Sequence, residues 1–383
     1  MKQLSSRQVG IILFISIVSL KFIIMPSLVF GISKNNSHLS ILLNLVSDFS
    51  SIFSYFWFMK KYPNLTFKTA LETCFGKIFA KIIFGLLAFY FFFKAFITLK
   101  EIQNYFNRVL FDDFDWVKYI IPSTALLAYI SSKSFKTFGR CGEILIYIAI
   151  FCIIIIIPLS LKSATFAELL PIFQNGVPPI LKGAFASTFG FGDYIFMLLF
   201  IGKIKTTKKT NKTLLLYSIS AMIIIYLLYL IFIATFGNLA SNENLAISDL
   251  SLNISIPPTV GRLDWINILL WSFILFFNTG LLLASAKECL LVTFGTEKQN
   301  YILLGMFCVY IGFLLYEELS LSIVLQIISS TPFVMFASLI QIGYPALLVL
   351  TGLILKKKNI LCNKIFTFNN SNNIKVKKYD KSY

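Results

Sequence analysis

The sequence predicts an all-α polytopic membrane protein with ten transmembrane helices in a five-plus-five inverted repeat. Of the 383 residues, 57% are hydrophobic and only 13% are charged, well below the ~25% charged residues usual in soluble domains. Apolar stretches long enough to cross a bilayer as helices recur along the chain. Basic residues concentrate in alternate segments between these stretches. This composition excludes soluble, disordered, collagen-like and disulfide-scaffold proteins.

Ten stretches are predicted to span the bilayer. Their approximate limits are 8–32, 39–59, 82–105, 118–132, 143–161, 180–202, 213–237, 262–286, 300–316 and 330–355. The first is longer than the apolar region of a signal peptide and no small-residue cleavage site follows it, so we interpret it as a retained span. The third and eighth are long enough to tilt. The fourth is the shortest and one of the more polar.

The basic residues support this count. If the N-terminus is cytoplasmic, the inner segments hold 25 of the 34 Lys and Arg residues, the outer segments hold six and the spans hold three. Such an excess marks the cytoplasmic side of a membrane protein. Both termini are therefore predicted to be cytoplasmic. Five spans per half invert the second half relative to the first, which is the plan of many secondary transporters.

The domain organisation follows from this plan. Residues 1–355 are predicted to form one membrane domain, with halves at about 1–161 and 180–355. The Pro-rich, amphipathic segment 162–179 is too broken to span and predicts an interfacial helix on the outer side. The Lys/Asn-rich tail 356–383 is predicted to be cytoplasmic and mostly disordered.

The residues for common catalytic and metal sites are scarce. The six Cys residues include no CxxC pair, and His38 is the only His. A zinc site or a His-based catalytic triad is therefore not expected. No nucleophile–base pair is evident either, so we expect neither an enzyme nor a bound cofactor.

The first span of each half is interrupted. Pro26 follows Lys21 in the first, and proline removes a backbone hydrogen-bond donor. The sixth contains the polar, Gly-rich run 187–193, Ser-Thr-Phe-Gly-Phe-Gly-Asp. Broken helices at corresponding positions of two halves indicate a binding site, because their free N–H and C=O groups face a cavity. The alternative is a packing kink, since Gly and Pro are common in membrane helices.

Six charged residues lie within the predicted spans. They are Lys21, Asp48, Lys94, Lys100, Glu101 and Asp193. Each costs about 2.5–3.5 kcal/mol if unpaired at depth, so they should face a cavity or one another. We hypothesise that Lys21 and Asp193 meet across a central site; alternatively, Lys21 snorkels or pairs elsewhere. Lys100 and Glu101 are interpreted as interfacial, and Asp48 as part of a polar helix-packing seam.

Motifs along about residues 3–355 carry a family resemblance. They are Ser5-Ser-Arg-Gln8, Met25-Pro26-Ser27-Leu28, Lys100-Glu101, Phe166-x-Glu168-Leu-Leu-Pro171, Asn175-Gly176, Pro179-Ile-Leu-Lys-Gly183, Gly190-Phe-Gly-Asp193, Arg262-Leu-Asp264, Trp271 and Phe294-Gly295. Their order and spacing resemble the spore-germination permease family. Its members are the B subunits of nutrient germinant receptors, within the amino acid–polyamine–organocation superfamily.

The resemblance implies a LeuT-like transporter fold with broken helices 1 and 6. It also implies A and C partner subunits in the spore inner membrane, and a small nutrient germinant, often an amino acid, bound between spans one, three, six and eight. The corresponding ligand-binding residues are Lys21, Phe22, Ile24, Pro26, Ser27, Phe91, Lys94, Ser187, Thr188, Phe189, Gly190, Gly192, Asp193 and Asn278. Two departures leave the ligand's charge open: members often have a small residue where Lys21 stands, and many carry a Lys near Asn278.

Three functions fit these features. The leading one is a germinant-sensing receptor subunit, in which ligand binding shifts the bundle between two conformations. The alternative is a proton-coupled amino-acid permease, with Asp193 or Lys21 changing protonation during the cycle. The third is a scaffold subunit that anchors partners and binds no ligand.

Overall fold

The structure is a computed structural model of the chain. It describes residues 4–21, 25–109, 116–204, 207–243, 246–252, 263–316 and 321–357. Two of the predicted ligand-binding residues, Phe22 and Ile24, lie outside the described residues, as does the tail beyond residue 357. The described part is almost wholly helical, and its one β-bridge joins Leu4 to Ile204.

Both halves of the described chain consist mainly of helices, which follow one another in this order. In the first half these are α1 (Ser6–Leu20), α2 (Met25–Ser33), η1 (Lys34–Asn36), α3 (Ser37–Lys61), α4 (Phe67–Phe75), α5 (Lys77–Val109), α6 (Trp116–Ser132), α7 (Phe135–Ser160) and η2 (Phe166–Leu169). In the second half they are α8 (Pro178–Ser187), η3 (Thr188–Gly190), η4 (Asp193–Phe196), α9 (Met197–Phe200), α10 (Lys208–Phe236), η5 (Gly237–Ser241), α11 (Ala246–Leu252), α12 (Leu263–Phe294), α13 (Gln299–Leu315), α14 (Leu321–Ser329) and α15 (Thr331–Ser338). After α15 a π-helical turn, η7 (Leu339–Gly343), leads into helix that continues to Lys357.

The helices have the length and surface of a polytopic membrane protein. Within the described residues, seven helical segments are long and apolar enough to cross a membrane, and three shorter apolar helices accompany them. The exterior carries large apolar side chains, such as Ile78, Ile144 and Leu216, which are 78%, 68% and 68% exposed. An apolar exterior of this extent fits contact with lipid rather than water. The all-α polytopic fold class is therefore confirmed, whereas the count of ten crossings and the inverted repeat stay predictions.

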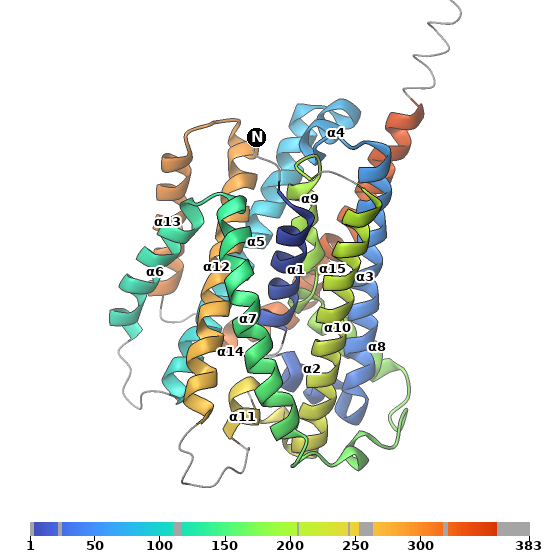
Figure 1. The fold of residues 1–383 in the computed structure, drawn as a ribbon, viewed down its shortest axis with the longest axis vertical. Helices are drawn as coiled ribbons and strands as arrows, with labels where there is room; N and C mark the ends of the chain where they lie inside the picture. Colours follow the sequence, from blue (N-terminus) through green and yellow to red (C-terminus); the bar gives the residue numbers. More distant parts are fainter. Residues whose placement is uncertain are drawn as a thin grey trace, which may run out of the picture.

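The two termini of the described chain lie at the same end of the bundle (Figure 1). The short helix α4 lies at this end too, and we call it the basic end after the Lys-rich segments expected there. The α2–α3 junction, α11 and the segment before α8 lie at the opposite end (Figure 1). α1 packs against α10, α7 and α12, while α5 and α12 pack along each other.

Both predicted helix interruptions are present. α1 begins with a capping box between Ser5 and Gln8 and ends at Leu20, and α2 begins at Met25. Pro26 is therefore the second residue of a new helix, where its missing N–H has no intrahelical partner to lose. α8 ends at Ser187, and the chain passes through a left-handed Gly192 (φ 83°) before α9. The breaks place backbone polar groups inside the bundle, where side chains must satisfy them.

The segment between the halves differs from the predicted interfacial helix. Before α8 begins at Pro178, only Phe166–Leu169 is helical, as a 3₁₀ turn. Pro171 lacks a backbone donor, and Phe173 and Gly176 have φ values of 63° and 73°, so the chain cannot continue as a regular helix. The segment is instead tied to the α2–α3 junction. Asn35 Nδ2 donates to the Leu170 carbonyl at 3.1 Å, and the Phe173 N–H donates to Asn36 Oδ1 at 2.9 Å.

A ladder of polar side chains holds α8 against α2 and α3. Ser33 Oγ donates to the Pro179 carbonyl at 2.9 Å, and Ser40 Oγ donates to the Ile180 carbonyl at 2.8 Å. A Cβ at Gly183 would lie only 2.0 Å from Ser33 Oγ. Glycine therefore permits the close approach on which the ladder depends.

We predict that Gly183→Ala destabilises the protein by about 1–3 kcal/mol, because the added methyl group must push Ser33 away from α8. The matched control is Gly31→Ala in α2, where a Cβ meets nothing within 4 Å. Thermal unfolding of the detergent-solubilised protein measures both. Equal melting temperatures for the two variants would contradict the packing argument.

Candidate functional site

Four charged side chains converge where the two broken helices meet. Lys21 is the C-cap of α1, Asp48 lies on α3, Lys94 lies on α5, and Asp193 begins η4 after the break in the sixth predicted span. Each is no more than 3% exposed. We call these four residues the charge cluster.

The charge cluster is a continuous chain of ion pairs that runs from Asp48 through Lys21 and Asp193 to Lys94. Lys21 Nζ donates to Asp193 Oδ2 and lies 3.5 Å from Asp48 Oδ2. Lys94 Nζ donates to the other Asp193 oxygen, Oδ1, at 2.9 Å. Two ammonium groups and two carboxylates sum to no net charge, which is the condition for charged groups to persist in hydrocarbon. The hypothesis that Lys21 and Asp193 meet is confirmed.

The helix breaks supply the rest of the network. Lys94 Nζ donates to the Phe191 carbonyl at 2.9 Å, and the Tyr90 hydroxyl donates to the same oxygen at 3.1 Å. On the other side, the Tyr229 hydroxyl donates to the Lys21 carbonyl at 2.6 Å. Each of these carbonyls stands at a break, where the regular intrahelical hydrogen bonding ends.

Aromatic rings surround the ammonium groups. Lys21 Nζ lies 5.0 Å from the centroid of the Phe191 ring, and Lys94 Nζ lies 5.8 Å from that of Phe189. Ring faces attract cations and exclude water. Phe91 of α5 stacks on Phe196, which ends η4 just after the break in the sixth predicted span; the two ring centroids are 5.1 Å apart.

Two predicted ligand-binding residues, Ser187 and Thr188, have hydrogen-bond partners within the protein. Ser187 Oγ accepts from Asn44 Nδ2 at 2.8 Å and donates to the Gly183 carbonyl at the same distance. Thr188 Oγ1 donates to the Ala184 carbonyl at 3.1 Å. These hydroxyls therefore join α8 to α3 and to its own backbone.

The small residues around the breaks are packed closely. Pro26 and Ser27 are buried in the first turn of α2. A Cβ at Gly190 would lie 2.7 Å from Met25 Sδ, and one at Gly192 would lie 3.0 Å from Tyr90 Oη. The glycines thus let the two breaks and α5 come together.

Asn278 is a predicted ligand-binding residue with unused hydrogen-bonding capacity. It is fully buried on α12, and among the described residues neither atom of its amide has a hydrogen-bond partner. Trp271 Nε1, two turns earlier on the same helix, is likewise buried and unpartnered within the described residues. Because buried polar groups are normally hydrogen-bonded, Asn278 stays a candidate ligand-binding residue.

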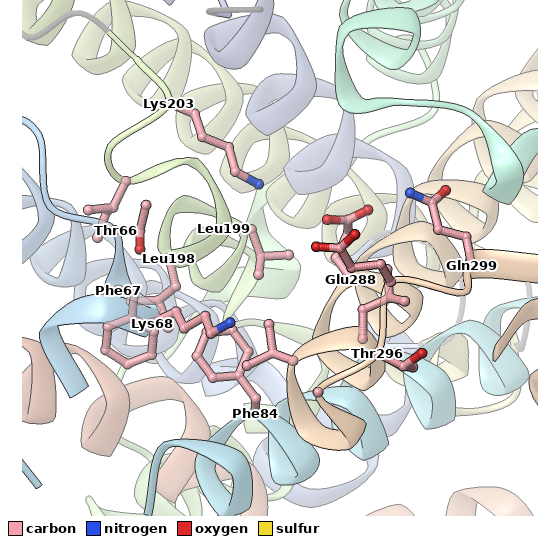
Figure 2. A pocket seen from close by; sticks show the side chains of 15 residues that line it. Thr66, Phe67, Lys68, Phe84, Leu198, Leu199, Lys203, Glu288, Thr296 and Gln299 are labelled. Atoms are coloured by element: carbon pink, nitrogen blue, oxygen red, sulfur yellow. The ribbon is translucent and has the colours of Figure 1, made fainter. Parts of the chain in front are cut away.

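A separate pocket lies at the basic end of the bundle. It has a volume of about 530 Å³ and is lined by residues of α4, α5, α9 and the end of α12. Figure 2 shows Lys68 and Lys203 directed into it from one side and Glu288 and Gln299 from the other. None of the predicted ligand-binding residues lines it, so it does not replace the charge cluster as the candidate site.

A family described as "Spore germination protein" matches residues 3–322. The chain belongs to this family. The matched region contains both broken helices and all four residues of the charge cluster. No protein with curated annotation matches the chain. Family membership and the apolar helices together show an integral membrane protein of permease-like type that is related to spore germination.

One interpretation of the charged residues from the sequence was wrong. Asp48 belongs to the charge cluster rather than to a helix-packing seam alone. Lys100 and Glu101 are 7% and 3% exposed, so other residues cover both, and their interfacial position stays a prediction.

Sequence reasoning also missed residues of the site. Tyr90 lies one turn before Lys94, a spacing that places both on one helix face and signals a shared partner. Tyr229, on α10, carries no such local signal. Among the described residues, no group of three or more His, Cys, Asp or Glu side chains is placed to hold a metal.

Neutralising one member of the charge cluster should cost more than neutralising a pair. We predict that Asp193→Asn destabilises the protein by about 3–5 kcal/mol, because it leaves two lysines facing one carboxylate. Adding Lys94→Met should recover much of this loss, since Lys21 and Asp48 then remain paired. Thermal unfolding in detergent compares the two variants. A double variant no more stable than the single one would show that charge balance is not the cause.

Proposed function

We propose that the protein is the membrane subunit of a spore nutrient-germinant receptor. In this proposal it binds a small polar germinant, such as an amino acid, at broken helices 1 and 6 and signals germination. The observation that carries the proposal is the charge cluster, which lies at both breaks and joins them. Membership of the spore germination family supports the biological role.

The charge cluster favours a dipolar ligand. A zwitterion presents a carboxylate to the lysines and an ammonium to the aspartates, so it can exchange with the internal ion pairs without changing the buried net charge. A ligand with net charge leaves one buried group uncompensated, which costs several kcal/mol. Amino acids satisfy this condition.

Signalling requires a change in the ion pairs. Asp193 accepts from both Lys21 and Lys94, so a ligand ammonium at Asp193 separates η4 from α1 and α5. The ligand shifts the equilibrium only by its greater affinity for the separated state. Partner subunits read that state. We propose A and C subunits as these partners, residence in the spore inner membrane, and cytoplasmic termini, in line with the predicted excess of basic residues on one side.

A proton-coupled amino-acid permease is the second candidate. The observation in its favour is Asp48, whose one ion pair among the described residues is with Lys21 Nζ at 3.5 Å. If Lys21 moves toward a ligand carboxylate, Asp48 loses this partner in a buried site and takes up a proton. Such a step is the coupling device of proton-driven transporters. We propose no enzymatic activity.

Binding of amino acids to the purified subunit tests the proposal. We expect one or more neutral amino acids to raise its melting temperature, because a ligand that binds only the folded state stabilises it. Asp193→Ala should abolish this shift. Glu288→Gln is the matched control, since Glu288 is a half-exposed carboxylate outside the charge cluster. If no amino acid shifts the wild type, or if Asp193→Ala still responds, the ligand does not use the cluster.

Transport separates the two candidate functions. We expect proteoliposomes containing the protein to show no counterflow of a labelled amino acid that the binding assay identifies, because a sensor needs only to change conformation. Uptake that rises with an imposed proton gradient would instead favour the permease. Liposomes carrying Asp193→Ala give the background rate.

A further inference from the structure

A groove on the outside of the bundle runs between α6, α7 and α12. Its volume is about 650 Å³, and its lining is almost wholly apolar. Leu126, Ile144 and Phe273 in this lining are 45%, 68% and 54% exposed, so the groove opens toward lipid. Its lining extends along α12 from Leu269 to Phe277, about 12 Å at 1.5 Å per residue.

One end of the groove carries a cation. Lys133, in the turn between α6 and α7, is the one charged residue of the lining. Its Nζ lies 3.9 Å from the centroid of the Tyr129 ring, which fixes the ammonium at the mouth of the groove. None of the ion pairs among the described residues includes Lys133. Lys136 and Arg140 follow within two turns of chain.

The combination matches one class of ligand. An apolar groove of this length has room for part of an acyl chain, and an ammonium at its end binds a phosphate. The Lys-rich turn lies toward the basic end of the bundle (Figure 1), where the sequence predicts the cytoplasmic leaflet with its anionic lipids. We propose that this groove is a binding site for an anionic phospholipid, with the phosphate at Lys133 and an acyl chain along α12.

A second groove gives an internal comparison. It lies between α5, α12 and α13, has a volume of about 530 Å³, and is lined by Phe89, Phe93 and Phe313 among other residues. No charged side chain contributes to its lining. Acyl chains of any lipid fit there, whereas the groove at Lys133 discriminates between headgroups.

Native mass spectrometry tests whether the charge of Lys133 selects the lipid headgroup. The full-length protein is measured in an equimolar mixture of phosphatidylglycerol and phosphatidylcholine. We expect the wild type to retain one phosphatidylglycerol with about fivefold preference, the effect of roughly one basic residue at a membrane surface. Lys133→Glu should abolish this preference. Lys61→Glu is the matched control: it makes the same charge change on a lysine that lies over the Trp57 ring, 4.8 Å from its centroid, outside the groove.

A bulky side chain placed in the groove tests whether the lipid binds there. Cys141 lines the groove and is exposed, so Cys141→Trp should lower phosphatidylglycerol retention while leaving Lys133 in place. Cys308→Trp is the control, at an exposed cysteine on α13 that lines neither groove. Equal retention of both lipids by the wild type, an unchanged preference in Lys133→Glu, or unchanged phosphatidylglycerol retention in Cys141→Trp would overturn the proposal. So would crosslinking of Cys141 to another receptor subunit that phosphatidylglycerol does not reduce, since a protein helix would then fill the groove.

Discussion

Charge neutrality inside the bilayer is the constraint on which this structure depends. An isolated lysine or aspartate costs several kcal/mol in hydrocarbon, whereas balanced and hydrogen-bonded charges can persist there. Lys21, Asp48, Lys94 and Asp193 meet this condition only because α1, α3, α5 and η4 converge. The arrangement of these helices is therefore inseparable from the pairing of their charges.

The helix breaks and the charges support each other. A break frees a carbonyl that must find a donor, and Lys94 and Tyr229 are donors at the two breaks. The second half of the chain contributes one residue to the cluster, Asp193, and the first half contributes three. Movement of η4 consequently exposes two lysines at once. A balance between a joined and a separated state is what a ligand needs in order to act as a signal.

The sequence predicts the fold class well because its signals are local. Apolar length defines the helices, and Pro26 and the Gly-rich run before Asp193 define the breaks. The pairing of Lys21 with Asp193 was also predictable, since both stand at breaks. Asp48 and Tyr229 were not, because their roles depend on how α3 and α10 turn toward the cluster.

Lys21 bears directly on what the site can recognise. The resemblance to spore-germination permeases implies that many members have a small residue at this position, which leaves room for a ligand ammonium beside the acid of the sixth span. Here the Lys21 ammonium already occupies that place, held by Asp193 and facing the Phe191 ring. Under the proposed function, a ligand must therefore displace a cation that belongs to the chain itself. Because this exchange replaces one ammonium by another, its free energy depends on where Lys21 goes. The carboxylate of Asp48 and that of a zwitterionic ligand are the two anions that can receive it. In the proposed receptor, selectivity accordingly rests on the ligand's carboxylate as much as on its amine.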